Sequence, residues 1–386
     1  MNRKQFLLLT LAVVLAGLAG WTVHRRQGAA WLSAGPAFGQ KLFPNFPVND
    51  IDRITLRSAT NELVLFRRDG AWRVRERADY PADFAQVSSL LLKCADLKAA
   101  QTEDAAGPLL GRFELLPPAS GTNAGLRIEF ANSHGPVGSL LLGKMHLAKA
   151  TGASQFGGSE GWPDGRYILV GDAPPVVVVR EPLENVVTKP EAWLDKNFFS
   201  IEKPVSISVQ FETATNSWKL TRASITNDWQ LDAAAPGEKP DPAKVSALSS
   251  PFRSPNLSDV LPPGTEAGSA GLTNVILVTV QTSDGLTYSI RIGSRQGADY
   301  PLQFTVSGQP PAARTPEPGE SADDKKRRDD EFAKNREALV EKLSREQSRQ
   351  AWIYQVPSWL VEPLLVTRQQ LVGEDRKPET NEPAAP

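Results

Sequence analysis

Two stretches of the chain follow one residue pattern, and this repetition constrains the fold more than any other feature. Each stretch begins with Trp, any residue and an aliphatic residue, passes through a polar segment that contains Pro, and ends in Asp-x-Ala-x-Val-x-x-Leu. The first runs from Trp72 to Leu90 and the second from Trp229 to Leu248. A long pattern that recurs in the same order indicates a unit that the chain builds twice. We therefore expect two tandem domains related by duplication.

The repeated pattern is typical of a strand followed by a helix. Trp72 and the aliphatic residue two positions later share one face of a strand, after an Asp-Gly pair that favours a hairpin turn. Asp83 and Asp241 are expected helix N-caps, because their carboxylates can accept the N–H groups left free in a first turn. The apolar residues after the first cap lie at helical spacing: Val87, Leu90, Leu91, Cys94 and Leu97. We expect Trp72 and Trp229 to be buried against the helices, and Cys94 to be a core residue and not a reactive thiol.

The segments around these stretches also correspond in order. Alternating strands are expected before each Trp and after each helix, and Gly143 and Gly293 close equivalent strands. We expect an α+β fold of two duplicated units, each an antiparallel sheet packed by one or two helices, after an N-terminal transmembrane helix. The expected boundaries are 48–203 for the first domain, 204–372 for the second, about 309–350 for a charged insertion within it, and 373–386 for a disordered tail.

The charged insertion distinguishes the second copy from the first. Its Pro-rich beginning has too little apolar surface to order itself. A helix is expected from about Asp323 to Gln350, with a thin apolar stripe that consists of Phe332, Leu339, Val340 and Leu343. We expect a solvated arm that lies on the domain, with a partner-binding helix as the alternative.

The N-terminus carries a long apolar segment. The stretch from Phe6 to Val23 has no charged residue, and as a helix it would span about 27 Å, close to the ~30 Å of a hydrocarbon core. We expect residues 1–26 to anchor the chain in the bacterial inner membrane as a single span, with 27–47 as a spacer and the domains in the periplasm. The alternative is a signal peptide with a cleavage site at Gly17-x-Ala19.

Composition excludes several classes of protein. The chain has 43 basic and 44 acidic residues and a formal net charge of −1, so we expect no nucleic-acid partner. A single Cys excludes an intrachain disulfide. His134 and His146 have no Cys or carboxylate at ligand spacing near them, so we expect no metal site.

Matches to catalytic and phosphate-binding motifs lack the surroundings that those motifs need. Ser159 stands in Gly-x-Ser-x-Gly, but no strand precedes it, the residues after it oppose a helix, and no His follows it in the chain. Ser200-x-x-Lys203 leads at once into a strand, where a Ser/Lys pair would need a helical turn. Gly143-Lys144 lacks the upstream Gly and the Ser or Thr of a phosphate loop. We therefore assign no catalytic, cofactor-binding or metal-binding residue and no cofactor.

The order of the segments resembles one known family. The apolar span is followed by "LFPNFPVNDIDRITLRS", "LVLFRRDGAWRV", "YPADFAQVSSLL", paired strands and "RYILV". This order resembles the family called domain of unknown function 4340, over most of 43–200 and more loosely over 205–372. The resemblance implies an envelope protein that works with an ABC transporter whose permease resembles the gliding-motility-associated auxiliary type. It implies no catalytic residue.

The expected function is therefore non-enzymatic. We expect a membrane-anchored periplasmic accessory or adaptor protein of an ABC-type transport or envelope-assembly system, with the membrane and a transporter permease or auxiliary subunit as partners. The alternative is an envelope glycan-binding protein or hydrolase with a site in the cleft between the two repeats. A glycan platform would use exposed tryptophans, of which Trp162 is the one expected at the surface.

Overall fold

The computed structural model describes residues 36–147, 162–236, 238–248, 250–316 and 319–372. They form two compact units. Unit 1 comprises the described residues up to Glu76 together with Ala82–Trp193, and unit 2 comprises Arg77–Pro81 and the residues from Leu194 onward. Residues 194–203, expected at the end of the first domain, thus group with unit 2.

The expected membrane span and C-terminal tail lie outside the described residues. Within the ranges that the structure describes, no helix is long and apolar enough to cross a bilayer. The expected spacer is described from residue 36, and it is part of unit 1. The N–H groups of Gly39 and Leu42 donate to the carbonyls of Ala99 and Leu97, at 2.8 and 2.9 Å.

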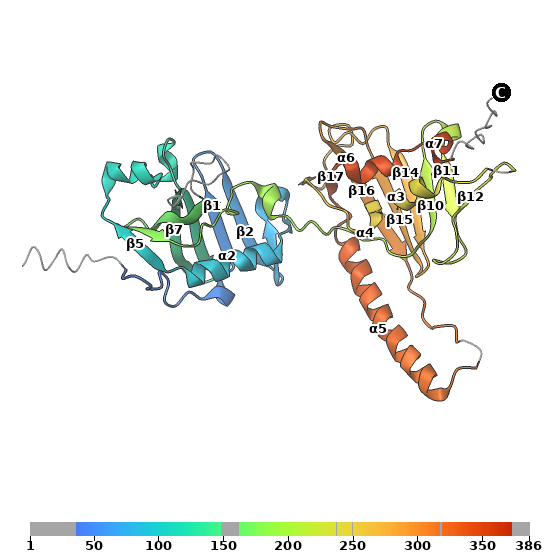
Figure 1. Ribbon diagram of the computed structural model, residues 1–386, viewed down its shortest axis with the longest axis horizontal. Helices are drawn as coiled ribbons and strands as arrows, with labels where there is room; N and C mark the ends of the chain where they lie inside the picture. Colours follow the sequence, from blue (N-terminus) through green and yellow to red (C-terminus); the bar gives the residue numbers. More distant parts are fainter. Residues whose placement is uncertain (1–35, 148–161, 237, 249, 317–318, 373–386) are drawn as a thin grey trace, which may run out of the picture. The chain divides into compact units, whose positions relative to one another are not determined.

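Unit 1 is built on an antiparallel sheet. Its strands are β1 (Arg53–Arg57), β2 (Glu62–Arg68), β3 (Ala71–Val74), β5 (Ala99–Glu103), β6 (Leu126–Asn132), β7 (Gly135–Leu147), β8 (Pro163–Val170) and β9 (Val176–Val179). They lie in the order β3-β2-β1-β6-β7-β8-β9-β5, and helix α2 (Phe84–Asp96) lies beside the sheet (Figure 1). The two-residue strand β4 (Tyr80–Pro81) falls in the segment that groups with unit 2.

The predicted turn and helix of the first stretch are confirmed. Asp69 and Gly70 have φ angles of 53° and 78°, as the central residues of a type I′ hairpin turn require. The Asp83 carboxylate accepts the N–H of Gln86 at 3.1 Å and so caps α2. The predicted core face is buried: Trp72, Val87, Leu90, Leu91, Cys94 and Leu97. Burial raises the pKa of the Cys94 thiol to about 12, which keeps it protonated and unreactive.

Unit 2 is built on a second antiparallel sheet. Its strands are β10 (Pro204–Gln210), β11 (Trp218–Thr221), β12 (Gln230–Leu231), β13 (Asp259–Leu261), β14 (Ile276–Thr282), β15 (Leu286–Ile292), β16 (Asp299–Gly308) and β17 (Ile353–Pro357). They lie in the order β12-β11-β10-β14-β15-β16-β17-β13. Its helices are α3 (Pro242–Ala247), α4 (Ser250–Arg253), α5 (Ala322–Gln347), α6 (Ser358–Val361) and α7 (Arg368–Leu371).

The two sheets share one strand order. If the strands of each unit are numbered from one to eight along the chain, without β4, both sheets have the strand order 3-2-1-5-6-7-8-4. In both units the fourth strand follows the capped helix. Gly143 and Gly293 follow the equivalent residues Leu142 and Ile292; Gly143 lies within β7, and Gly293 comes directly after β15. At both positions an added Cβ would come within 2.2 Å of a backbone carbonyl oxygen.

The second stretch departs from the prediction in two ways. Asp241 caps α3, accepting the N–H of Ala243 at 2.8 Å, but this helix ends after only six residues. Pro251 explains the stop, because its ring would clash with the carbonyl four residues earlier, that of Ala247. The prediction that Trp229 is buried like Trp72 is wrong: the residue is partly exposed, because it lines an open groove.

The long charged helix of the insertion is confirmed, but its expected position is not. Helix α5 has 26 residues and would extend about 39 Å at ~1.5 Å per residue. Of its described residues, only Leu343 and Glu346 are buried, and Figure 1 shows the helix projecting from the rest of unit 2. The prediction that it lies along the domain is therefore wrong for most of its length, because its apolar stripe is too thin to pack on a sheet.

The close approach at the two equivalent glycines gives a test of the fold. Gly143→Ala and Gly293→Ala should each lower the free energy of unfolding by roughly 3 kcal/mol, because the new methyl group would overlap the carbonyl oxygens of Phe113 and Gly271. Urea unfolding of the purified chain measures this loss. Gly268→Ala is the control, because a Cβ there meets no atom within 4 Å. Equal stability of all three variants would refute the assigned packing.

Candidate functional site

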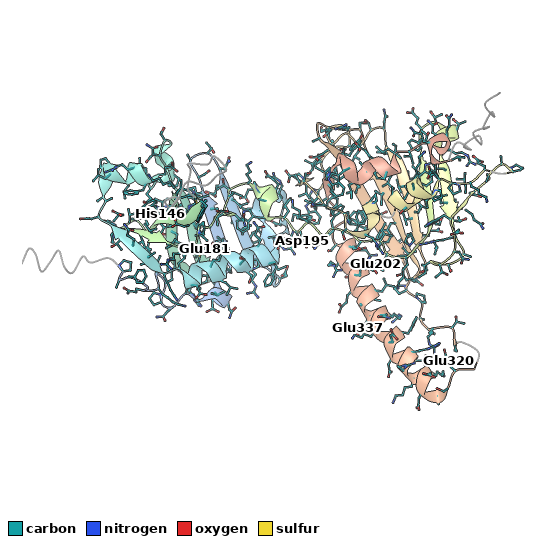
Figure 2. All side chains as sticks on the ribbon, viewed as in Figure 1. His146, Glu181, Asp195, Glu202, Glu320 and Glu337 are labelled. Carbon is teal, nitrogen blue, oxygen red and sulfur yellow. The ribbon has the colours of Figure 1, made fainter. Side chains whose placement is uncertain are left out.

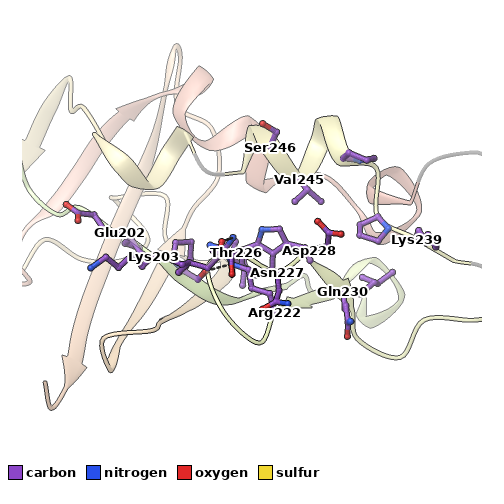
Figure 3. Close-up of a pocket in the computed structure, with 18 of the residues that line it drawn as sticks. Glu202, Lys203, Arg222, Thr226, Asn227, Asp228, Gln230, Lys239, Val245 and Ser246 are labelled. Atoms are coloured by element: carbon purple, nitrogen blue, oxygen red, sulfur yellow. Dashed lines mark hydrogen bonds between the residues drawn. The ribbon is translucent and has the colours of Figure 1, made fainter. Parts of the chain in front are cut away.

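Unit 2 contains a groove of about 1570 Å³ between α3 and the strands β10 to β12. Its floor is apolar and includes Ile201, Ile207 and Leu231, which are 1%, 2% and 7% exposed. Figure 3 shows Val245 above the groove and Arg222 below it. In unit 1 the apolar residues of the equivalent helix, α2, are buried against the sheet. The groove is therefore a feature of unit 2.

Arg222 and Trp229 form the central feature of the groove. The guanidinium carbon of Arg222 lies 4.4 Å from the centroid of the Trp229 ring, a cation–π contact. The Nε of Arg222 donates to the carbonyl of Pro204 at 2.8 Å, and its Nη1 donates to the carbonyl of Ile225 at 3.0 Å. Burial lowers the pKa of Arg222, but the group stays charged at neutral pH. The pair therefore presents a fixed cation beside a partly exposed aromatic ring.

The rim of the groove has more cationic than anionic groups available to a ligand. Four basic and three acidic residues line it: Lys203, Arg222, Lys239, Arg253, Glu202, Asp228 and Glu238. Glu238 is already engaged, because it accepts the Ala235 N–H at 2.8 Å and binds Arg368 at 2.9 Å. These two contacts hold the pKa of Glu238 below its usual value. With Glu238 engaged, four basic and two acidic side chains remain, and this excess of positive charge favours a ligand that carries negative charge.

The residues considered for catalysis or metal binding do not come together. Ser159 and its Gly-x-Ser-x-Gly motif lie outside the described residues. The Ser200 hydroxyl donates to the carbonyl of Arg253 at 2.9 Å, and Lys203 stands in a bend with a φ of 51°, directly before β10 and not on a helical turn. Gly143-Lys144 lies within β7 and forms no phosphate loop.

The histidines give no metal centre in the described part of the chain. His134 lies in the turn between β6 and β7, whereas His146, labelled in Figure 2, lies on β7 with its Nδ1 2.6 Å from Asp164 Oδ1. Among the residues that the structure describes, no three His, Cys, Asp or Glu side chains could hold a metal ion. Trp162 is 70% exposed, as predicted.

The second candidate surface is the arm, by which we mean the described residues of 309–341. Its base is held by a buried carboxylate: Glu346 is 3% exposed. Glu346 accepts the Tyr288 hydroxyl at 2.8 Å and the Ser200 N–H at 2.9 Å, and Lys342 Nζ lies 2.8 Å from it. Burial, reinforced by Glu346, raises the pKa of Tyr288, so the phenol remains a donor. Three donors thus offset the desolvation of one buried charge.

A second buried contact holds the chain that follows α5. Arg349 is 6% exposed, and its Nη2 lies 2.6 Å from the Asp195 carboxylate. The Tyr354 hydroxyl donates to the Arg349 carbonyl at 2.6 Å, and the Gln350 amide donates to the carbonyl of Val306 at 3.0 Å. The base of the arm is therefore fixed to the sheet on both sides of the end of α5.

The far end of the arm is also fixed. Arg314 bridges Glu320, at 2.7 Å, and Asp329, at 3.0 Å, and Arg328 contacts Glu320 at 3.0 Å. The side chain of Glu320 is 7% exposed, and Figure 2 shows this residue near the outer end of the arm. The described part of the Pro-rich segment is thus tied to α5 by charge, where we had expected it to lack order.

Three features of the sequence bear on these surfaces without matching any catalytic motif. Pro251 marks the early end of α3, and Glu346 falls on the same helical face as Leu339 and Leu343, at spacings of seven and three residues. Trp229 was assigned to the core by equivalence with Trp72, although the residues after it differ.

The buried contact of Tyr288 with Glu346 gives a test of the arm's anchor. Tyr288→Phe should lower the free energy of unfolding by about 2 kcal/mol, because a buried carboxylate loses one donor. Tyr300→Phe, on neighbouring β16, is the matched control and should change it by less than about 0.5 kcal/mol. Thermal and urea unfolding measure both. If Tyr288→Phe leaves the free energy of unfolding unchanged, burial of Glu346 does not depend on this donor.

Comparison with known proteins gives one match. The family described as Domain of unknown function (DUF4340) matches residues 72–275, a range that begins at Trp72 and takes in the groove residues Arg222 and Trp229. No curated protein and no solved structure matches the chain. Because the matched range covers more than half of the 386 residues, this chain belongs to the DUF4340 family.

Proposed function

We propose that this chain is a non-enzymatic, membrane-anchored accessory protein of an ABC-type transport or envelope-assembly system, with its two units in the periplasm. The observation that carries the proposal is the arm. It projects from unit 2, it is fixed at base and tip, and most of α5 is exposed. A protein does not need such a helix to complete its own core, so its surface is available for another molecule.

The surface of the arm suits a protein partner. Its helix mixes acidic and basic side chains along its length, which favours a complementary charged surface over a single-sign ligand such as nucleic acid. Phe332 and Leu339 are partly exposed and Val340 is 44% exposed, so an apolar strip lies among the charges. A transporter permease or its auxiliary subunit is the partner that we propose.

We also infer that the two units arose by tandem duplication. The shared strand order supports this, as do the paired caps Asp83 and Asp241 and the paired glycines Gly143 and Gly293. The apolar stretch from Phe6 to Val23 supports the anchor. In this scheme the second copy acquired the arm as an insertion between its last two long strands, β16 and β17.

A second candidate function is binding of an envelope glycan. The observation that favours it is the partly exposed ring of Trp229 beside Arg222, because sugars stack on aromatic rings in polar grooves. The two candidates differ in which surface carries the activity: the arm for an accessory protein and the groove for a glycan-binding protein.

Removing the arm tests the accessory function. Replacing 309–341 by a short Gly/Ser linker retains Lys342, Glu346 and Arg349, and should abolish co-purification with the transporter permease from gently solubilised membranes. Val340→Glu, a single exposed change on α5, should reduce recovery by about tenfold, equivalent to about 1.4 kcal/mol. Quantitative mass spectrometry of the tagged chain and its partners measures both.

The control is Leu109→Glu, which introduces the same charge at an apolar side chain of unit 1 that is 52% exposed. It should leave the partner bound. Recovery of the unaltered chain alone, under conditions that keep the transporter intact, would contradict the accessory function.

A further inference from the structure

A sheet edge that is covered in unit 1 lacks the same cover in unit 2. In unit 1 the N–H of Ala82, one residue before the cap Asp83, donates to the carbonyl of Trp72 on β3 at 2.9 Å. In unit 2 the residue one before the cap Asp241 is Pro240, which has no N–H. The equivalent bond to Trp229 therefore cannot form.

The cap that follows this residue bonds alike in both units: the Asp83 N–H donates to the carbonyl of Trp193 at 2.8 Å. The Asp241 N–H donates to the carbonyl of Leu371 at 2.8 Å, and Pro240 forms an isolated bridge with Val372. The groove lies open between Trp229 and Leu231 on one side and Lys239 and Pro240 on the other. At this edge, Pro240 cannot supply the hydrogen bond that Ala82 supplies in unit 1.

The register of β12 fixes which backbone groups face the open edge. Leu231 lies opposite Leu220, and Gln230 opposite Thr221, on β11. The Asp232 N–H donates to the carbonyl of Lys219 at 2.8 Å, so Asp232 points its backbone groups toward β11. In an antiparallel ladder this direction alternates, so Gln230 also points inward, whereas Trp229 and Leu231 point their N–H and C=O groups outward. β12 is the last strand of its sheet.

We propose that this groove binds an extended peptide with acidic side chains, which adds a strand to the edge of β12. Its main chain would pair with the outward groups of Trp229 and Leu231, which gives affinity that does not depend on side chains. Its acidic side chains would meet Arg222, Lys203 and Lys239 at the rim. This site goes beyond the accessory function proposed for the arm and does not depend on it.

Three observations favour a peptide over a glycan or an acyl chain. The open edge offers paired main-chain donors and acceptors, which only another backbone matches in spacing. Arg222 already covers one face of the Trp229 ring, which removes half of a stacking platform for sugars. The rim carries seven charged residues, which is unsuited to an acyl chain.

The probe for the experiment comes from the chain itself. The peptide Arg77–Phe84, with blocked ends, contains Ala82, whose N–H makes the equivalent bond in unit 1, and the acidic residues Asp79 and Asp83. Its matched control carries N-methylalanine in place of Ala82, which removes only that donor. Isothermal titration into the full-length protein in detergent should show the parent peptide binding at least about tenfold more tightly than the control.

Protein variants locate the site. Lys239→Glu should weaken the parent peptide by about tenfold, because it reverses a rim charge, whereas Lys189→Glu, the same exposed change in unit 1, should not. Trp229→Phe should remove the shift that the peptide causes in one indole N–H signal by NMR. Neither variant touches the arm, so permease co-purification reports separately on the accessory function.

Several results would overturn the proposal. These are absence of binding, equal binding of the N-methylated peptide, or equal binding to Lys239→Glu. A soluble glycan fragment that displaces the peptide, together with equal binding of the N-methylated control, would assign the groove to sugars instead. None of these outcomes bears on the function of the arm, which permease co-purification tests separately.

Discussion

The hydrogen bond from Ala82 to the carbonyl of Trp72 is the interaction on which the comparison of the two units depends. Where it forms, the edge strand is covered and the tryptophan beside it is buried. Where Pro240 replaces its donor, the edge strand keeps outward groups, a groove opens and the equivalent ring of Trp229 is partly exposed. An exposed strand edge is a hazard for any sheet protein unless it is short, charged or used. The exposed edge strand of unit 2, β12, is short and lies beside charged side chains, as expected for an edge that binds a ligand.

The arm depends on a different physical balance. Burying Glu346 and Arg349 in the base costs free energy, and such charges stabilise a fold only when most of their hydrogen-bonding capacity is met. Glu346 meets three donors, whereas Arg349 contacts Asp195 through Nη2 and leaves its buried Nε and Nη1 without a hydrogen bond. The Glu346 cluster is therefore the better satisfied of the two. The geometry of these contacts fixes the direction of α5 more strongly than an apolar patch of the same size would, since apolar packing is non-directional. A helix with so little apolar surface therefore has a defined orientation on unit 2.

The part of the fold that sequence reasoning predicted is the part determined by local chemistry. The Asp caps, the Asp69-Gly70 turn, the buried face of α2 and the role of Cys94 each depend on residues close together in the chain. The groove was not predicted, because it lies between residues 11 positions apart, Trp229 and Pro240, and because equivalence with Trp72 favoured burial. The orientation of α5 was not predicted either, since it depends on Tyr288 and Ser200, far away in the sequence. The signal in the sequence is that Pro240 precedes the cap Asp241 where Ala82 precedes the cap Asp83.

The distribution of these features between the two units bears on function. Both units have the same constraints on folding, because Gly143 and Gly293 leave no room for a side chain and the Asp caps satisfy free backbone groups. Differences between the units must leave these constraints intact. The Pro before the second cap, the Pro251 that shortens α3 and the insertion after β16 all do so, and all three fall in unit 2. Since each exposes surface that the fold does not require, binding functions are best sought in unit 2, and unit 1 serves as the natural reference in which the same architecture is closed.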